Sequence, residues 1–336
     1  MSTKIQSKDI SVIVQGAINQ YTKQSLLSIR KFLPEAEIIL STWEGSDVGG
    51  LDYDILLLNQ DPGAEIFTKS GTKHNINRQI LSTQNGLKKT TRKYSLKLRS
   101  DSVLLGNKFL KYFDKYNVRA KKCKILEKRV LVLNWSTRLP KVSPTLLFHP
   151  SDFFAFGLTS DLLNIWDIPL AKEPEFSSYF KNNTAKNPEF LVRSLCKFPS
   201  EMYIWLAFLE KNGVNVNIQD YTDCLDEDLI NLSELTIVNN LCVLDYKSQF
   251  DVLCKKYVHP HYPTMPVYHF VDWVKNYEKY CGVRVKKNFE YYFSGVYAFC
   301  HGIACFIQRN KKKIIRFKFG KKEKYFMLFG VYLFKK

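Results

Sequence analysis

The sequence predicts an α/β fold with a mostly parallel central sheet. Over about the first hundred residues, short apolar runs alternate with segments of helical periodicity, which is the pattern of βα units. The chain has 336 residues, of which 45% are hydrophobic, so it can bury a large core. Its 15 glycines and 12 prolines are too few for a collagen-like or low-complexity protein, and both classes are excluded.

The N-terminal elements follow from these runs. Strands are predicted at 10–14, 37–41, 53–58 and 94–99. A first helix is expected to begin at Thr22, a residue type suited to capping, and to end at Pro34. A second helix is expected from about Asn75, because the apolar residues that follow it recur on one helical face.

The pattern is looser after residue 130. Strands are predicted at 131–133, 145–148 and 153–158, and helices at 201–211, 271–280 and 291–308. The segment 171–199 is polar and contains prolines, which predicts a loop-rich region of the kind that often carries specificity. Residues 255–270 contain three prolines and are expected to connect to a C-terminal part.

The net charge of +18 is concentrated in two segments. Residues 86–129 carry fifteen Lys and Arg against three acids, a net charge of +12, and residues 306–336 carry eleven against one, a net charge of +10. The rest of the chain sums to −4. Two basic segments indicate two local acidic partners and argue against a protein whose whole surface binds nucleic acid.

The last of these segments interleaves basic and aromatic residues. The run from Tyr325 to Phe334 is almost wholly apolar and has lysines on both sides. We expect residues 309–336 to contact an anionic membrane, with each nearby basic residue contributing about 1 kcal/mol. A groove for single-stranded nucleic acid, or a buried strand or docked helix with charged flanks, would give a similar pattern.

Targeting signals and cysteine chemistry place the protein inside the cell. The eight cysteines form no CxxC pair, and a chain of this length needs no disulfide framework, so reduced thiols are expected. The N-terminus carries no secretory signal, and no apolar run reaches the ~18 residues of a membrane helix. A cytoplasmic protein, at most peripheral to a membrane, is predicted.

Polar residues follow several predicted strands at their carboxyl ends, where open α/β sheets bind their ligands. These residues are Gln15-Gly16, Trp43-Glu44 with Asp47, Asn59, and Arg99-Ser100-Asp101. No GxGxxG follows the first strand and no GxxxxGK[ST] occurs, which counts against a dinucleotide fold and a phosphate-binding loop. A nucleotide held mainly by side chains remains compatible with this pattern.

Asp101 could bind a divalent metal that bridges a diphosphate, because Mg²⁺ and Mn²⁺ prefer oxygen ligands. A solvated aspartate that caps a turn is the favoured alternative when Asp101 is taken alone. Arg78, Lys97 and Arg99 favour the site, since guanidinium groups clamp phosphates with two hydrogen bonds. The helix before this strand is also rich in polar side chains, Asn77 among them.

The segment 43–47 combines a ring that can stack on a base or sugar with the carboxylates of Glu44 and Asp47. A glycine-containing turn with a half-buried Trp43 is an equally good interpretation without context.

Candidates for proton transfer are His149, Asp152 and Glu201, because an attacking sugar hydroxyl must lose its proton to a carboxylate or imidazole. Alone, His149 is better explained as a satisfied loop residue, and Glu201 as an acid in the first turn of a helix. Histidines 259, 261 and 269 lack paired cysteines or a nearby acidic cluster and are interpreted as structural.

Four runs together resemble the WavE lipopolysaccharide synthesis family of bacterial glycosyltransferases, over roughly residues 9–215. They are Ser11-Val-Ile-Val-Gln-Gly16, Ala36-Glu-Ile-Ile-Leu-Ser-Thr-Trp-Glu-Gly-Ser-Asp47, Asn75-Ile-Asn-Arg-Gln79 and Lys97-Leu-Arg-Ser-Asp101. The C-terminal tail also resembles segments of bacterial surface-polysaccharide glycosyltransferases. The resemblance implies a GT-A type fold with a nucleotide-sugar-binding half (1–105), an acceptor-binding half (106–255) and a C-terminal helical extension (256–336) with a basic aromatic tail.

The resemblance also implies roles for these residues. Enzymes of the GT-A type hold a metal-diphosphate with a DxD motif, and here that position reads Arg99-Ser-Asp101, which keeps only the last carboxylate. The resemblance therefore leaves open whether Asp101 binds a divalent metal, Mg or Mn, since the nearby cationic side chains could stabilise the leaving diphosphate without one. Gln15, Gly16, Trp43, Glu44 and Asp47 would hold the nucleoside, and Asn77, Arg78, Arg99 and Asp101 the diphosphate. Glu201 is the first choice as general base of an inverting reaction, and Asp152 the second.

The expected activity is transfer of a sugar from a nucleotide-sugar donor to a lipopolysaccharide-core, capsule or other surface-polysaccharide acceptor, lipid-linked or oligosaccharide, at the cytoplasmic face of the inner membrane. No nucleic-acid partner is expected. The alternative from another class is a non-catalytic nucleic-acid-binding protein that uses the basic segment 86–129. A phosphotransferase on the same architecture is disfavoured by the missing phosphate-binding loop.

Overall fold

The computed structural model describes most of the chain. The described residues are 5–66, 73–140, 146–191, 196–246, 249, 251–254, 267–319, 324–328 and 331–335, with the backbone alone at 65, 66, 73 and from 308 onward.

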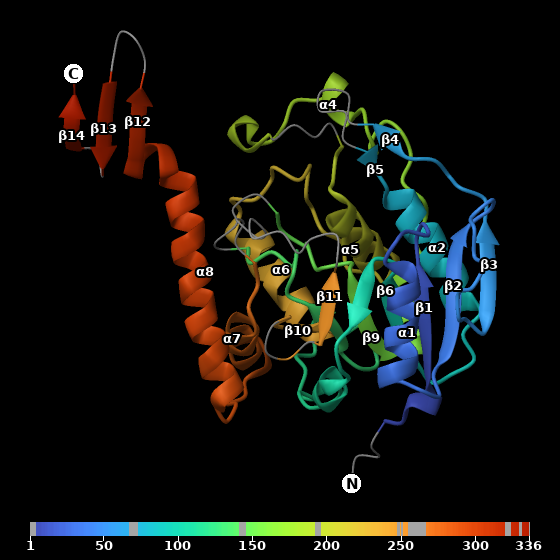
Figure 1. The fold of residues 1–336 in the computed structure, drawn as a ribbon. Coiled ribbons are helices and arrows are strands. Elements are labelled where there is room, and N and C mark those ends of the chain that lie inside the picture. Colours follow the sequence, from blue (N-terminus) through green and yellow to red (C-terminus); the bar gives the residue numbers. More distant parts are fainter. Residues whose placement is uncertain are drawn as a thin grey trace.

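A seven-stranded sheet forms the centre of the molecule (Figure 1). Its strands are β1 (Ile10–Gln15), β2 (Glu37–Trp43), β3 (Ile55–Asn59), β6 (Tyr94–Arg99), β8 (Val130–Leu133), β9 (Phe154–Leu158) and β10 (Leu241–Leu244). They lie in the order β10-β8-β9-β6-β1-β2-β3, and neighbouring strands are parallel except where β9 is involved. The predicted α/β fold with a mostly parallel, Rossmann-like sheet is confirmed.

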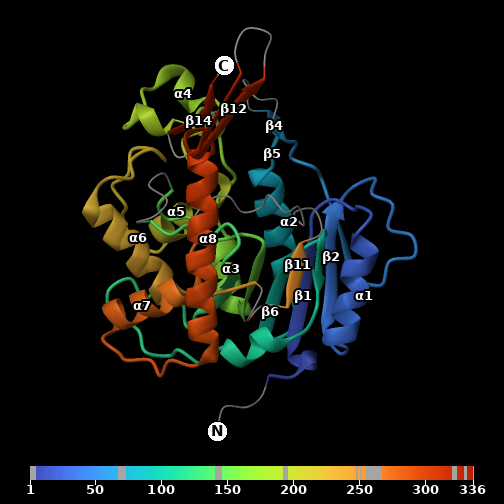
Figure 2. The same ribbon diagram turned by 60° about the vertical axis from the view of Figure 1, so that its left-hand side comes forward.

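Two helices cover opposite faces of this sheet. α1 (Thr22–Phe32) connects β1 to β2. α2 (Ile76–Lys88) lies in the connection from the edge strand β3 back to β6. The two crossovers step across the sheet in opposite directions, so right-handed connections must place their helices on opposite faces. Figures 1 and 2 show α1 and α2 on either side of the strands.

Local details differ from the expectation at the start of α1. The N-cap residue is Tyr21, and the Thr22 hydroxyl makes no cap bond to the helix. It accepts a hydrogen bond from the Asn19 backbone N–H at 3.0 Å, in the turn before the helix. The threonine therefore stabilises the β1–α1 loop, while the helix begins without a side-chain cap.

The second half of the chain completes the same sheet and adds further helices. These helices are α3 (Thr159–Trp166), α5 (Ser200–Lys211), α6 (Glu227–Asn240) and the short α4 (Tyr179–Asn182). The strand expected at 145–148 is wrong for the part that is described, because 146–148 pair with no strand, while Thr145 lies outside the described residues. The edge strand β10 was not predicted, because its short apolar run directly follows α6 without a turn signal.

Two small sheets lie beside the main one. β7 (Ser102–Leu104) pairs with β11 (Val252–Cys254), and β4 (Glu65–Ile66) with β5 (Lys73–His74), both antiparallel. Single 3₁₀ turns occur at η1 (Ser7–Asp9), η2 (Lys108–Tyr112) and η3 (Pro188–Phe190). The first pairing ties the segment near residue 253 to the chain just beyond Asp101.

The C-terminal part consists of helices followed by strands. α7 (Phe270–Cys281) contacts α6, and α8 (Phe289–Ile314) contacts α7 and continues into β12 (Ile315–Phe319), β13 (Lys324–Leu328) and β14 (Val331–Lys335). These last strands form an antiparallel sheet, so the expected helical extension consists of α7 and α8, and the basic aromatic tail follows as strands. None of the described helices combines the length and apolar character that crossing a bilayer requires.

The expected division at residues 105 and 255 stays a prediction. The central sheet runs unbroken across the first boundary, since β6 belongs to the first half and its neighbour β9 to the second. Of the expected connection at 255–270, residues 255–266 lie outside the described residues.

Candidate active site

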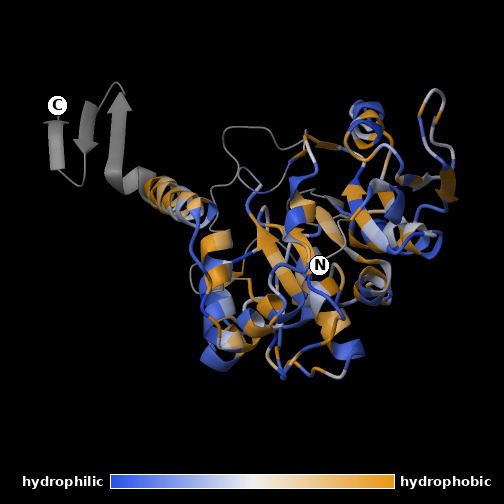
Figure 3. Ribbon diagram, turned by 90° about the horizontal axis from the view of Figure 1, so that it is seen from below, coloured by the Kyte–Doolittle hydropathy of each residue, from blue (hydrophilic) through white to orange (hydrophobic). Residues whose placement is uncertain are grey.

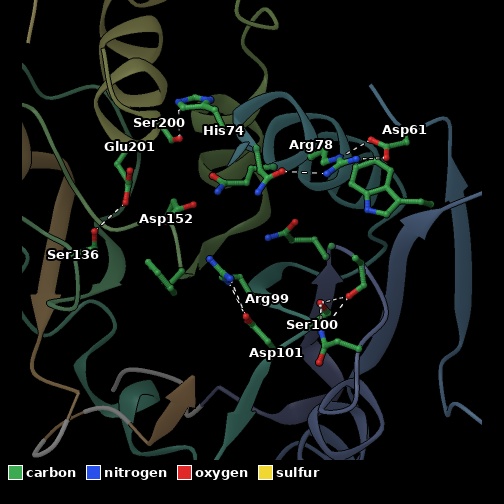
Figure 4. A pocket seen from close by; sticks show the side chains of 18 of the residues that line it. Asp61, His74, Arg78, Arg99, Ser100, Asp101, Ser136, Asp152, Ser200 and Glu201 are labelled. Carbon is green, nitrogen blue, oxygen red and sulfur yellow. Dashed lines mark hydrogen bonds and ion pairs between the residues drawn. The ribbon is translucent and has the colours of Figure 1, made fainter. Parts of the chain in front are cut away.

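A pocket of about 1110 Å³ opens at the carboxyl ends of β1 and β6 (Figure 4). From β1 the chain moves outward through β2 and β3, and then returns to place β6 on the other side of β1. The strand order therefore reverses between β1 and β6, which is where open α/β sheets bind ligands. The last residues of the two strands, Gln15 and Arg99, lie directly opposite each other in the parallel register and both line the pocket.

The floor of the pocket is built from two loops that hold each other. The Ser100 hydroxyl donates to the Ala17 carbonyl at 2.7 Å and accepts from the Asn19 amide at 3.2 Å. Gly16 has φ +114°, and a Cβ there would lie 3.3 Å from the Ser100 oxygen. Glycine is thus required by backbone conformation and by the close approach of the serine. The β1 and β6 loops form a preorganised surface.

Arg99 and Asp101 form a pair with two hydrogen bonds at the centre of the pocket. Arg99 donates from Nε to Asp101 Oδ1 at 3.0 Å and from Nη2 to Oδ2 at 2.8 Å. The Arg99 guanidinium also lies over the Phe153 ring, at 4.5 Å from its centroid. Because the side chains are only 18% and 9% exposed, the pair is well shielded from solvent. Asp101 thereby orients a cation toward the pocket.

This arrangement does not fit a divalent-metal site. Both carboxylate oxygens of Asp101 are already bonded to Arg99, and the Cys254 thiol lies 3.6 Å from Oδ1. Among the described residues, no three His, Cys, Asp or Glu side chains are grouped as metal ligands. A metal at Asp101 would have to displace the guanidinium, so the metal stays a prediction and no step below uses it.

A second arginine lies across the pocket, on α2. Arg78 donates from Nε to Asp61 Oδ1 at 2.7 Å and from Nη2 to Asp61 Oδ2 at 2.5 Å. Its Nη1 donates to Asn75 Oδ1 at 3.2 Å. The hydrogen bonds from Arg78 lower the pKa of Asp61, which therefore stays ionised and holds the guanidinium in place.

Two carboxylates lie on the opposite side of the pocket, Asp152 before β9 and Glu201 in the first turn of α5 (Figure 4). Burial, and then the charge of Glu201, raise the pKa of Asp152. The Asp152 Oδ2 atom is buried and has no hydrogen-bond partner among the described residues. Glu201 is held by a hydrogen bond from the Ser136 hydroxyl at 2.9 Å to Oε1. Ser136 has φ +71°, a strained conformation of the kind found at functional sites.

His149 lies behind Glu201 and is uncharged. Burial, and then the charge of Arg138, lower its pKa to about 3. Its Nδ1 lies 3.1 Å from the Ser136 carbonyl, which can only accept, so Nδ1 carries the proton. The unprotonated Nε2 then faces Glu201 Oε2 at 3.5 Å. This contact is not an ion pair at neutral pH, because His149 is uncharged. The His149 Nε2 atom can accept a hydrogen bond from Glu201 when the Glu201 carboxyl is protonated.

A fully buried lysine supports this side of the site from below. Lys97 donates to the backbone carbonyl of Asp152, and its Nζ lies over the Trp166 ring at 4.8 Å from the centroid. Burial lowers its pKa to about 8. Lys97 was predicted as part of the phosphate-binding neighbourhood, but it does not line the pocket and instead holds the segment that carries Asp152.

The structure brings most of the predicted site residues together. Those that line the pocket are Gln15, Gly16, Trp43, Arg78, Arg99, Asp101, Asp152 and Glu201. Glu44 and Asp47 lie beyond Trp43 in the exposed turn, where Asp47 accepts from the Gly49 N–H. The Asn77 side chain does not line the pocket and makes two hydrogen bonds with the Ala171 backbone. The geometry therefore does not support a donor contact for these three residues.

Other lining residues were missed by sequence reasoning. They include Asn19, Gln20, Tyr21, Asp61, His74, Gln79, Ser136, Phe153, Cys196 and Ser200. Asn19 could have been found, since it follows the first strand end by only a few residues. Asp61 and Ser136 carry no signal of their own, because their place depends on loops that fold back over the sheet edge.

The comparisons with known proteins agree with this architecture. Residues 10–301 match the WavE lipopolysaccharide synthesis family, a span that contains the sheet and every residue of the pocket. None of the curated proteins compared matches the chain. Because the match covers most of the sequence, the chain belongs to the WavE family of lipopolysaccharide synthesis.

Proposed function

We propose that this protein is a glycosyltransferase that moves a sugar from a nucleotide-sugar donor to a lipopolysaccharide-core, capsule or other surface-polysaccharide acceptor. The observation that carries the proposal is the pocket at the point where the strand order reverses, which brings two fixed arginines, Arg99 and Arg78, together with two carboxylates, Asp152 and Glu201. That combination suits a reaction in which a diphosphate leaves while a hydroxyl loses its proton. Membership of the WavE family supports it.

The donor would lie along the carboxyl edge of β1, β2 and β6. Trp43 offers a ring for the base, and Gln15 and Gly16 line the adjacent floor. The diphosphate would lie between Arg99 and Arg78, each of which is held by a carboxylate and keeps its position without reorganising. Fixed cations in a shielded site stabilise the charge that develops on the leaving group.

The reaction would be a single displacement. The acceptor oxygen attacks the anomeric carbon, the bond from that carbon to the diphosphate oxygen breaks, and the electron pair leaves with the diphosphate. The hydroxyl proton passes to Glu201. Because attack and departure occur on opposite faces of the sugar, the configuration at the anomeric carbon inverts.

Glu201 remains the first choice for the base. Its side chain is 16% exposed, whereas the carboxylate oxygen Oδ2 of Asp152 is sealed from solvent. Ser136 fixes one Glu201 oxygen, and the neutral His149 can accept a hydrogen bond from the other once it is protonated. Asp152 is the second candidate, and its raised pKa suits a group that takes up a proton.

A thermal-shift panel of nucleotide sugars, with and without Mn²⁺, tests the function. A donor at a hundredfold excess over its dissociation constant should stabilise the protein by about 2.7 kcal/mol. Asp101→Ala should lose that shift and the transfer activity, because Arg99 is then no longer held. The site assignment is wrong if Asp101→Ala retains full transfer with the native donor, and the function is wrong if no nucleotide sugar shifts the protein.

We further propose that the enzyme works at the cytoplasmic face of the inner membrane, where a lipid-linked acceptor would be presented. The proposed contact with anionic lipid is through residues 309–336, which carry most of the second basic segment. The side chains of that segment lie outside the described ones, so the proposed lipid contact is argued from its amino-acid composition alone. Vesicle binding that survives removal of residues 309–336 would refute attachment through the tail.

A further inference from the structure

The helix α8 packs on the body of the protein through its polar side. Ser294 is fully buried and accepts from the Val271 backbone N–H at 3.0 Å. About two turns further on, His301 is buried against His269, with His301 Nδ1 3.1 Å from His269 Nε2. Cys305 completes the buried row, with its thiol 3.5 Å from His301 Nε2.

The outward side of α8 is apolar over its whole described length. Its exposed large residues are Phe289, Tyr292, Phe293, Val296, Phe299, Ile303, Phe306 and Ile307. The two most exposed, Phe289 and Phe299, are 79% and 69% accessible. Between Phe289 and Ile307 the sole charged residue is Glu290, which turns back to Lys111 at 2.6 Å. Figure 3 shows the helix dominated by hydrophobic residues, and Figure 2 shows it along the outside of the molecule.

The polarity of α8 is opposite to that of a helix on a water-exposed surface. A surface helix places its apolar stripe on the core and its charged residues outward, and a large contiguous apolar patch marks an interaction surface. The polar contacts of Ser294 and His301 fix the rotation of α8, so the helix cannot turn its aromatic side inward without leaving those groups unpaired. The outward face of α8 is therefore an interaction surface for an apolar partner.

Charge at both ends of the helix identifies that neighbour. Arg284, Lys286 and Lys287 are exposed just before α8. The sequence places Arg309 and three consecutive lysines, 311–313, in its last turns. A second copy is disfavoured, because pairing two such faces brings basic ends together in the parallel and in the antiparallel orientation. An anionic lipid surface offers an apolar layer beneath negative headgroups and satisfies both features at once.

We propose that α8 is an in-plane membrane-docking helix, which inserts its aromatic face into the headgroup boundary of an anionic leaflet while its basic ends contact the headgroups. In Figure 1 the helix rises alongside the body in the direction of the parallel strands, toward the end at which the pocket opens. The apolar face lies in residues 289–307, ahead of the tail, whereas the C-terminal basic end of α8 belongs to the segment 309–336. The proposal does not depend on the identity of the donor.

Vesicle flotation of the full-length protein tests the proposal, with phosphatidylcholine vesicles that contain or lack phosphatidylglycerol. The double variant Phe289→Glu/Phe299→Glu should lower the partition coefficient on anionic vesicles by about a hundredfold, since each buried phenyl ring contributes about tenfold or more. Lys286→Gln/Lys287→Gln should weaken binding about fivefold per lysine at low salt.

Two controls separate lipid docking from other effects. Leu27→Glu, on α1, changes a comparably exposed apolar residue, at 54% accessibility, and should alter vesicle binding by less than about twofold. Phe326→Glu/Phe334→Glu introduces the same charges in the tail. If this tail variant abolishes binding while Phe289→Glu/Phe299→Glu does not, the tail is the anchor and the proposal is overturned.

The remaining outcomes are also decisive. Sedimentation velocity without vesicles should show a monomer for wild type and variants alike. A dimer that Phe299→Glu disrupts, together with no vesicle binding by the wild type, would assign the face to self-association and overturn the proposal. The thermal shift with nucleotide sugars should be unchanged in Phe289→Glu/Phe299→Glu, so failure of this inference and failure of the proposed reaction give different results.

Discussion

At the scale of single residues, the two carboxylates of the pocket differ in how they are held. Glu201 is oriented by Ser136 and backed by an uncharged His149, whereas Asp152 is sealed, with one oxygen unpaired among the described residues. Orientation and access favour Glu201 as the group that meets the acceptor hydroxyl. The buried charge of Asp152 instead depends on Lys97 beneath it.

Glu201→Gln should lower the turnover number by about 10²–10⁴-fold, because the amide cannot take the hydroxyl proton. The thermal shift with the donor should persist, since Glu201 lies opposite the cations. The matched control is Glu210→Gln, at an exposed position on the same helix α5, which should stay within about twofold of wild type. Initial-rate kinetics with the native donor give both numbers, and equal loss in the two variants would contradict the role.

His149 should make the protein sensitive to acid. Its pKa is about 3 in the folded protein, against the ordinary histidine value of 6.5 expected for the unfolded chain, so the unfolded chain binds more protons between these values. The free energy of unfolding should therefore fall as pH is lowered from about 6.5 toward 3, by up to about 1.4 kcal/mol per pH unit. Urea titrations at a series of pH values measure it.

His149→Gln should remove the contribution of this histidine and reduce the slope over the whole window. His74→Gln is the companion variant, because burial lowers the pKa of His74 only to about 4. The contribution of His74 to the pH dependence of stability should therefore end near pH 4. A His149→Gln protein with the wild-type slope would show that the histidine is already charged in the folded state.

At the scale of elements, α2 approaches β1 very closely. A Cβ at Gly86 would lie 2.4 Å from Ile13 Cγ2, so the helix can approach the strand only with glycine at this position. This contact sets the distance between α2, which carries Arg78, and β1, which ends at Gln15. The width of the pocket thus depends on a residue far from its opening.

Gly86→Ala should lower the free energy of unfolding by about 1–3 kcal/mol, because the added methyl group overpacks the interface. Gly302→Ala, on α8, is the matched control, since a Cβ there meets nothing within 4 Å. It should raise stability by about 0.5–1 kcal/mol through the higher helix propensity of alanine. Chemical denaturation measures both, and equal effects would argue against the tight contact.

The elements themselves were predictable where periodicity was clear. The strand at 94–99 lies within the same bounds in the structure, and α1, α2 and α5 are within a few residues of expectation. Predictions failed where one element directly follows another without a turn, as β10 follows α6. No turn residues then mark where one element ends and the next begins. The sequence does not decide between a strand and a helix for the tail, because alternating basic and aromatic residues fit a strand and a surface helix alike.

At the scale of the whole molecule, the basic segment 86–129 is not a continuous charged surface. Lys97 and Arg129 are buried. Lys111 is paired with Glu290 and Lys128 with Asp114. These four basic residues are therefore withdrawn from a continuous charged face by burial or pairing, which weakens the case for a nucleic-acid-binding face.

Salt dependence distinguishes the two function classes. A protein that neutralises 6–10 phosphates loses about 10³–10⁵-fold in affinity between about 50 and 200 mM salt. We expect any binding to a single-stranded oligonucleotide to disappear over this range, while the dissociation constant of the nucleotide-sugar donor rises by less than about tenfold. Fluorescence anisotropy and thermal shift measure the two. Oligonucleotide binding that stays strong at about 200 mM would favour the alternative function.

The sequence by itself determined the α/β class, the strand ends that form the pocket and the presence of two basic segments. These depend on local order along the chain, on alternation, helical period and the residues that end each strand. Only the tertiary structure showed that Arg99 occupies both oxygens of Asp101, that Lys97 is buried and that α8 turns its aromatic side outward. These facts depend on which groups meet across the fold, since pairing and burial join residues that are distant in the chain.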